Sequence, residues 1–162
     1  MAIERARAWL KEFDLDGRIL EFEVSSATVE LAAKAAGVIP ARIAKSMAFM
    51  TPEGPILVVT AGDARIDNPK FKAQFHAKAK MLGHDEVPAL IGHDVGGVCP
   101  FAINAGVRVF LDESMRRFDT VFPACGSANS AIELTCDELE RAAQGFAGWV
   151  DVCKGWREET CA

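Results

Sequence analysis

The sequence has no long run of apolar residues, although half of its 162 residues are hydrophobic. Apolar stretches such as 56–59 are far shorter than the roughly 20 residues that a membrane-spanning helix requires. Residues 1–13 intersperse charged side chains among apolar ones, so the apolar core of a signal peptide is absent. We therefore expect a soluble, cytoplasmic protein that is not integral to a membrane.

The sequence also lacks the residue spacings that hold metal ions. Its five cysteines form no CxxC pair, and its three histidines show neither HxxxH nor HxH spacing. We expect reduced thiols, no metal site and no cofactor.

Positive charge is scarce as well. The formal net charge is -5, whereas general nucleic-acid binders use an excess of lysine and arginine to contact phosphates. We therefore expect no DNA-binding activity, and any RNA partner would have to contact a local basic patch.

The pattern of apolar residues predicts one α+β domain that covers residues 1–162. A chain of this length buries roughly 68–70% of its unfolded surface without disulfide or metal support. Apolar spacing and boundary residues predict helices over about 3–17, 28–36, 68–82 and 87–91, and a long one from 135. Alternation and β-branched runs predict strands over about 20–24, 44–50, 56–60, 107–111, 130–134 and 146–153. The order lacks the regular βαβα alternation of a parallel doubly wound fold.

Capping and turn residues define several of these boundaries. Thr28 is an N-cap residue and Gly37 a C-cap residue for the second helix. Residues 135–138, Thr-Cys-Asp-Glu, form a capping-box sequence that starts the last helix. Residues 51–55, Thr-Pro-Glu-Gly-Pro, have turn chemistry throughout, so 44–60 is predicted to form a β-hairpin.

The predicted helix over 68–82 carries a row of basic residues. Lys72, His76 and Lys80 are four residues apart, on a different side from the apolar residues. Such a row is usually a solvated face, and the alternative is contact with an RNA backbone.

Lys45 occupies an unusual position for a cation. It stands in the predicted strand 44–50, where alternation places it on the same face as Met47 and Phe49. Its stem could lie along this apolar surface while the ammonium group reaches solvent. The alternative is a positive charge held in a pocket to meet a phosphate or a carboxylate.

The longest loop-like region, 83–100, ends in the glycine-rich sequence GGVCP at 96–100. Two glycines permit positive φ and close approach of a ligand, and successive N–H groups can bind an anion or a developing oxyanion. A plain connection between elements is the alternative. The Walker A and GxGxxG nucleotide-binding motifs are both absent.

Cys99 lies within that loop, close in sequence to His84 and His93. A cysteine–histidine nucleophilic pair is one interpretation. A buried, unreactive thiol is the other, because free cysteine is among the most buried residue types.

A second small polar segment, Gly-Ser-Ala-Asn-Ser, occupies 126–130. Its side chains could line a pocket beside the first loop. A turn with asparagine in the left-handed conformation explains it equally well.

Four segments of the sequence share their order and spacing with a known family. They are TVELAA at 28–33 followed by GV at 37–38, IAKS at 43–46, GGVCPF at 96–101 and GSANSAIEL at 126–134. Together they resemble the YbaK/prolyl-tRNA synthetase-associated editing-domain family, and the resemblance covers nearly the whole chain.

The resemblance implies a mixed, largely antiparallel β-sheet flanked by helices, and hydrolysis of the ester bond of a mischarged aminoacyl-tRNA. It assigns Lys45 to holding the 3′-terminal region of the substrate, and the loop Gly96–Pro100 to shaping the aminoacyl pocket. Water positioned by the loop backbone and by the terminal ribose hydroxyl cleaves the ester, so no protein nucleophile is required. An activated ester mainly needs a placed water and a stabilised oxyanion.

Site residues follow from the same resemblance. The expected catalytic positions are Lys45, Gly96 and Gly97. The expected substrate-binding positions are Thr28, Lys45, Ser46, Val98, Cys99, Pro100, Phe101, Gly126, Ser127 and Asn129.

The leading hypothesis is a trans-editing deacylase for tRNA(Pro) that carries a small wrong amino acid such as alanine or cysteine, with serine and threonine as further candidates. Selection by size cannot exclude smaller amino acids, which is why editing exists. Some relatives have a histidine where this sequence has Asn129, which leaves the amino-acid specificity open. An aminoacyl-tRNA synthetase is a candidate partner, and the oligomeric state stays open. The alternatives are a non-catalytic module that binds aminoacyl-tRNA or an amino-acid derivative, and a hydrolase that depends on Cys99.

Overall fold

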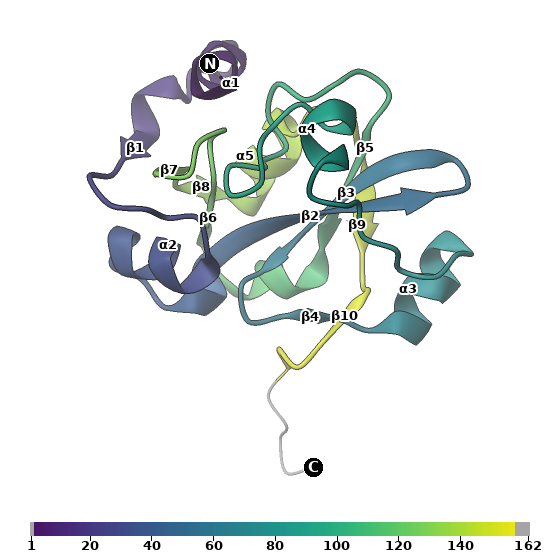
Figure 1. Ribbon diagram of the computed structural model, residues 1–162. Helices are drawn as coiled ribbons and strands as arrows, with labels where there is room; N and C mark the ends of the chain where they lie inside the picture. The colour runs from purple at the N-terminus through teal and green to yellow at the C-terminus, as the bar shows by residue number, and fades with distance from the viewer. Residues whose placement is uncertain (1, 158–162) are drawn as a thin grey trace.

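A six-stranded β-sheet forms the centre of the computed structural model, which describes residues 2–157 (Figure 1). In spatial order its strands are β8 (Leu134–Thr135), β6 (Thr120–Pro123), β2 (Ile43–Thr51), β3 (Gly54–Ala61), β5 (Arg108–Asp112) and β9 (Phe146–Val150). Two small sheets accompany it, formed by β1 (Ile19–Glu21) with β7 (Ser130–Ile132) and by β4 (Arg65–Ile66) with β10 (Cys153–Lys154).

Parallel and antiparallel pairings both occur. β6 is parallel to β2, and β5 is parallel to both β3 and β9. The other four pairings, β2 with β3, β6 with β8, β1 with β7 and β4 with β10, are antiparallel. The predicted α+β class with a mixed, largely antiparallel sheet is therefore confirmed.

The hairpin of β2 and β3 is one residue longer at each end than the predicted 44–60. Its two strands meet over eight residue pairs, and the turn is closed around Pro52 and Glu53. The Thr51 hydroxyl accepts a hydrogen bond from the Glu53 N–H at 3.2 Å and donates one to the Gly54 carbonyl at 2.8 Å. Gly54 has a φ of 114°, which favours glycine at this position.

β3 is buried on both of its faces. Residues Ile56 to Val59 are fully buried, as expected for an apolar, β-branched run in the middle of a covered sheet. Figure 1 shows α4 (Glu86–Leu90) and α5 (Cys136–Ala142) on one side of the sheet and α3 (Asn68–Phe75) on the other. On the α3 side, Phe71 packs against Phe49 and Phe75 packs against Phe110, each with ring centroids 4.9 Å apart, and the rings of Phe71 and Phe75 are 4.6 Å apart.

A smaller apolar cluster holds α2 (Val29–Ala36) beside the sheet. Ala32 and Ala33 of this helix pack with Ile43 of β2 and Phe122 of β6. The helix begins and ends where the sequence predicts. The Thr28 hydroxyl accepts a hydrogen bond from the Leu31 N–H at 3.2 Å, and Gly37 adopts a left-handed conformation with φ of 73°.

The predicted helix over 68–82 is wrong beyond residue 75. α3 ends at Phe75, and His76 adopts the left-handed conformation that terminates it. Residues 80–82 instead lie along the edge of β2, where the Leu82 N–H donates to the Ala48 carbonyl and the Met50 N–H donates to the Lys80 carbonyl. The row of Lys72, His76 and Lys80 therefore does not lie on one helix, because main-chain hydrogen bonds to β2 replace the later turns.

Several other predicted boundaries are also wrong. The first helix, α1 (Ala2–Lys11), ends well before Gly17, and the last helix, α5, has only seven residues. Glu133 separates β7 from β8, and residues 151–152 separate β9 from β10, where the Asp112 carboxylate accepts the Val152 N–H at 2.9 Å.

Two further differences concern the strands. The predicted strand 20–24 is reduced to β1, whose Leu20 is 41% exposed, and Val24 beyond it is 61% exposed. The short strands β4 and β6 were not predicted. Three short 3₁₀ segments complete the described structure at Asp16–Arg18, Pro40–Arg42 and Glu113–Arg117. Within residues 2–157, no helix has the length and apolar character to cross a membrane.

The predicted capping box at the start of α5 is confirmed and carries a further ion pair. The Thr135 hydroxyl accepts the Glu138 N–H at 3.1 Å, and the Glu138 carboxylate accepts the Thr135 N–H at 2.9 Å. The same carboxylate accepts a hydrogen bond from the Arg18 guanidinium at 2.7 Å. This bond lowers the pKa of Glu138, with a further contribution from the Thr135 N–H.

Glu138→Gln is predicted to remove a pH-dependent part of the stability while keeping a neutral capping acceptor. Because the pKa of Glu138 is lower in the folded state, its charge stabilises the fold at neutral pH, and this contribution is lost as pH falls through the folded pKa. Urea unfolding of both proteins from neutral pH to about pH 3 should give a stability difference that shrinks in acid. A difference that is constant over this range would contradict the prediction.

Candidate functional site

A cavity of about 370 Å³ lies beside β2, in the range typical of small-molecule sites. Five segments that are distant in sequence line it: 26–28 before α2, 43–48 of β2, 81–87 around the start of α4, the loop 95–98, and parts of 122–131. Thr28, Lys45, Ser46, Gly96 and Val98, all predicted from sequence, are among the lining residues. The fold thus brings Lys45 and the glycine-rich loop to one cavity.

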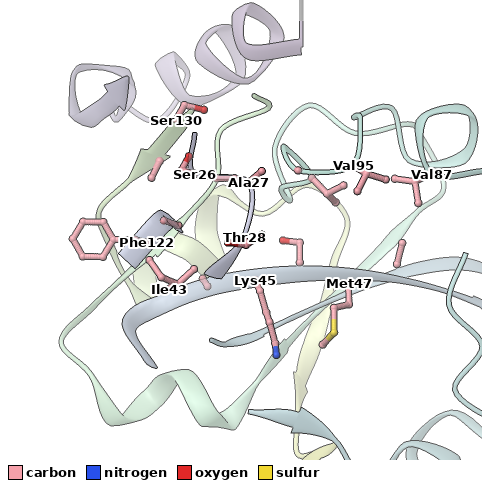
Figure 2. Close-up of a pocket in the computed structure, with 18 of the residues that line it drawn as sticks. Ser26, Ala27, Thr28, Ile43, Lys45, Met47, Val87, Val95, Phe122 and Ser130 are labelled. Atoms are coloured by element: carbon pink, nitrogen blue, oxygen red, sulfur yellow. The ribbon is translucent and has the colours of Figure 1, made fainter. Parts of the chain in front are cut away.

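Lys45 projects from β2 on the face opposite to the loop. Figure 2 shows the side chains of Lys45 and Met47 on one side of the strand, and those of Val87 and Val95 on the other. The Lys45 ammonium group donates a hydrogen bond to the Ala64 carbonyl at 2.6 Å. Burial lowers the pKa of Lys45, and the nearby Cys153 and Asp63 oppose this effect. Two of its three N–H donors stay free of that bond and can contact a ligand.

The loop 96–100 contributes to the cavity through only part of its length. Gly96 and Val98 line the cavity, and no partner for their N–H groups is found within residues 2–157. Gly97 is buried beside them, and its N–H donates to the Asp94 carbonyl at 3.0 Å. In this geometry the Gly97 N–H is therefore not free to contact a substrate.

Gly97 instead allows two loops to pack together. A Cβ atom at this position would lie 2.7 Å from the Ser127 nitrogen and 2.8 Å from the Gly126 carbonyl carbon. Only glycine permits this approach of the loop 96–100 to the segment 126–130.

Cys99 and His93 lie close together, as the nucleophilic-pair interpretation requires, but both are buried in the core. Cys99 is fully buried, and its Sγ lies 3.4 Å from His93 Nε2 and 3.6 Å from the Phe101 carbonyl oxygen. Burial raises the pKa of Cys99 to about 12. Cys99, Pro100 and Phe101 are buried away from the cavity lining, so the thiol is placed as an inert core group.

The segment 126–130 supports the cavity more than it lines it. Asn129 donates from its side-chain amide to the Phe22 carbonyl at 3.0 Å, and its own carbonyl accepts the Phe22 N–H at 2.7 Å. The Ser26 N–H donates to the Ala128 carbonyl at 2.6 Å. Gly126, Ser127 and Asn129 lie outside the lining, and these contacts hold residues 22–28 against the cavity.

Several lining residues were missed from sequence. They are mostly small or apolar: Ser26, Ala27, Ala32, Met47, Met81, Val87, Val95, Phe122, Ala124, Ser130 and Ala131. Met81 is 60% exposed and Val95 is 48% exposed, so the cavity has an apolar rim. Three of them had a signal in the sequence: Ser130 belongs to the polar segment 126–130 that could line a pocket, and Ala32 and Ala131 lie within the family-like segments 28–33 and 126–134.

The cavity contains no assembled nucleophilic triad. His84 lines it, but no hydrogen bond joins this histidine to a serine or threonine hydroxyl in the part of the chain that the structure describes. No cluster of three or more His, Cys, Asp or Glu side chains within residues 2–157 could hold a metal ion. The chemistry on offer consists of the Lys45 ammonium group, the His84 imidazole, several hydroxyls and main-chain N–H groups.

The class of protein that has this fold and cavity follows from the comparison with known families. The model of the aminoacyl-tRNA editing domain family matches residues 23–142. The chain therefore belongs to the aminoacyl-tRNA editing domain family. The match includes the lining segments 26–28, 43–48, 81–87, 95–98 and 122–131.

One relative known from sequence matches this chain over nearly the whole length of both proteins. The uncharacterized protein YwhH of Bacillus subtilis (strain 168) is 49% identical over 158 residues, which are 96% of this chain and 99% of YwhH. A proline–tRNA ligase of Bacillus cereus (strain AH820) is 27% identical over 86 residues, which are 52% of this chain but only 15% of the ligase.

Solved structures share the fold over nearly the whole chain. A protein described as a proposed trans-editing enzyme for prolyl-tRNA synthetase superposes with a TM-score of 0.85 and 26% identity, covering 95% of this chain and 98% of that one. The hypothetical protein APE2540 gives a TM-score of 0.82 and 27% identity, covering 93% and 99% of the two chains.

Gly97→Ala is predicted to destabilise the protein by roughly 1–3 kcal/mol, because the new methyl group meets main-chain atoms that cannot move aside. Gly17→Ala is the matched control, since a Cβ atom at Gly17 has no neighbour within 4 Å. Unfolding in urea measures the free energy of unfolding of both variants and of the wild-type protein. A Gly97→Ala protein as stable as the control would contradict the packing of the two loops.

The thiol of Cys99 is predicted to resist iodoacetamide in the folded protein at neutral pH. Its burial and its pKa of about 12 leave almost no accessible thiolate. Mass spectrometry should find Cys99 modified only after unfolding in urea, whereas the partly exposed Cys136 serves as the internal comparison. Rapid modification of Cys99 in the native protein would restore the nucleophile interpretation.

Proposed function

We propose that this protein is a trans-editing hydrolase that deacylates mischarged aminoacyl-tRNA. The observation that carries the proposal is the convergence of Lys45, Ser46 and the loop of Gly96 and Val98 on one cavity, in a chain of the aminoacyl-tRNA editing domain family. The site requires no cofactor, and the substrate is an ester that is already activated toward water.

Each group in the cavity has a task in this reaction. Lys45 has free N–H donors for the phosphate or ribose of the 3′-terminal nucleotide, and its apolar stem lies beside Met47. In this proposal the N–H groups of Gly96 and Val98, two residues of the cavity lining, stabilise the oxyanion that forms when water attacks the ester carbonyl. The terminal ribose hydroxyl helps to position that water, so no protein nucleophile takes part.

The favoured substrate is tRNA(Pro) that carries a small wrong amino acid, such as alanine or cysteine, with serine and threonine as further candidates. The structural relative proposed to act for prolyl-tRNA synthetase and the similarity to a proline–tRNA ligase support this choice. The cavity is lined by Ala32, Ala48, Ala124 and other small residues, which suits a small side chain. Such a reaction belongs to the cytoplasm, where an aminoacyl-tRNA synthetase is a candidate partner.

The proposal is tested by incubating the purified protein with tRNA(Pro) charged with alanine, cysteine, serine, threonine or proline. We expect release of at least one small non-cognate amino acid and slow release of proline. Binding without release from any of these would favour a non-catalytic aminoacyl-tRNA-binding module. If the protein neither releases an amino acid from these tRNAs nor binds them, both functions are refuted.

Lys45→Met is predicted to lower kcat/KM for the best substrate by about 10- to 100-fold, the value of one charged hydrogen bond. Methionine keeps an apolar stem, and circular dichroism with urea unfolding verifies that the variant is folded. Lys34→Ala, which alters an exposed lysine of α2, is the control and should leave the rate unchanged. A folded Lys45→Met protein with wild-type kinetics would remove Lys45 from the site.

A further inference from the structure

The edge of β2 that faces away from β3 is covered at both ends and open in the middle. β6 pairs with Ile43 and Ala44 at one end. At the other end, residues 80–82 hydrogen-bond with Ala48 and Met50, at 3.0 Å and 2.9 Å. Ser46 lies in the gap between these two covered stretches, and it lines the cavity.

The main chain of Ser46 points into this gap. In an antiparallel pair, alternate residues turn their N–H and C=O groups away from the partner strand. Ala48 and Met50 use those groups to bond residues 80–82, so Ser46, two residues earlier, turns in the same direction. Neither its N–H nor its C=O has a partner among the residues that the structure describes.

Two hydroxyl groups of the cavity are also without partners. The Oγ atoms of Ser26 and Ser46 are both buried, and within residues 2–157 neither has a hydrogen bond. Ser26 as a whole is only 7% exposed. Buried polar atoms normally find a partner, and both orphaned hydroxyls belong to residues that line one cavity, where a bound ligand would supply that partner. The nearby Ser130 differs, because its hydroxyl accepts a hydrogen bond from Ser127 at 2.7 Å.

The cavity offers neutral acceptors and no negative charge. No aspartate or glutamate is among its lining residues. Lys45 and Ser46 are adjacent in β2, so their side chains point to opposite faces, and the ammonium group of Lys45 is directed to the Ala64 carbonyl. A group that donates hydrogen bonds beside Ser46 would therefore be held by hydroxyl and carbonyl oxygens and not by an ion pair.

We propose that Ser46 and Ser26 bind the α-amino group of the ester-linked amino acid, an inference that rests on the proposed function. An α-amino acyl group carries an N–H donor and a carbonyl acceptor on either side of one Cα atom, as a residue of a β-strand does. The open edge of Ser46 presents the complementary C=O and N–H. The Ser46 carbonyl and the two serine hydroxyls accept from the amino group, and the Ser46 N–H donates to the ester carbonyl.

The test compares tRNA(Pro) charged with alanine and the same tRNA acylated with 2-hydroxypropanoate, which replaces the amino group by a hydroxyl of similar size. The wild-type protein should have at least a tenfold higher kcat/KM for the alanyl ester, because the hydroxyl supplies one donor where the amino group supplies more. The double variant Ser26→Ala, Ser46→Ala should bring the two values of kcat/KM to within about threefold of each other.

The ratio of kcat/KM for the two esters distinguishes binding of the amino group by Ser26 and Ser46 from a purely structural role of these residues. A general loosening of the fold would slow both esters equally, whereas loss of the proposed contacts slows the alanyl ester more than the 2-hydroxypropanoyl ester. Ser130→Ala is the matched control, since it removes a cavity hydroxyl that already has a protein partner. It should leave the ratio at its wild-type value. Equal rates for both esters in the wild-type protein, or a double variant that keeps the preference, would overturn the inference while leaving the deacylase function intact.

If neither ester is hydrolysed, the proposed function fails, and a binding experiment then tests the amino-group site by itself. Calorimetry would compare two stable amides of 3′-amino-3′-deoxyadenosine, one with alanine and one with 2-hydroxypropanoate. Tighter binding of the alanine amide that is lost in the double variant supports the amino-group site on its own. Equal binding, or binding of neither amide, overturns it.

Discussion

The hydrogen bonding of β2 determines where the candidate site forms. One edge of the strand is saturated by β3 over eight residue pairs, so the position and register of β2 are fixed. The other edge is shared between β6 and residues 80–82, which leave Ser46 uncovered. Because adjacent residues of a strand point to opposite faces, this one stretch presents Lys45 to one side and Ser46 to the other. Both residues contribute to the cavity lining, but the Lys45 ammonium group lies on the face of β2 opposite to the Ser46 side chain, where it donates to the Ala64 carbonyl.

Residues of the shared motifs divide into those that line the cavity and those that hold its walls in place. Gly96 and Val98 line it, whereas Gly97 allows the loop to pack on Gly126 and Ser127. Asn129 does not reach the cavity, and its amide and carbonyl fix Phe22 and so the segment before α2. Gly97 and Asn129 therefore hold the walls of the cavity in place from outside its lining. Main-chain groups can act on a substrate only when close packing holds them still.

Local features were predicted well where the sequence acts on its immediate neighbours. The hairpin 43–61, the caps of α2 and the capping box of α5 follow from turn and capping residues within a few positions of each other. The helix over 68–82 was predicted from apolar spacing and from Asn68 and Pro69 at its start, and it ends early, at Phe75, because residues 80–82 bond to a strand thirty or more positions away. β6 and β4 escaped prediction since strands of two to four residues carry too little alternation to be distinguished from loops.

By itself, the sequence determined the α+β class, the central hairpin and the segments from which the site is built, because propensity, alternation and capping are local properties. Only the tertiary structure decided which side chains face the cavity. It placed Lys45, Ser46, Gly96 and Val98 on its surface, turned Gly97, Cys99 and Asn129 away from it, and left the hydroxyls of Ser26 and Ser46 without partners in the described chain. Burial and hydrogen bonding depend on which distant residues pack next to each group. The residues adjacent in sequence do not specify these long-range contacts.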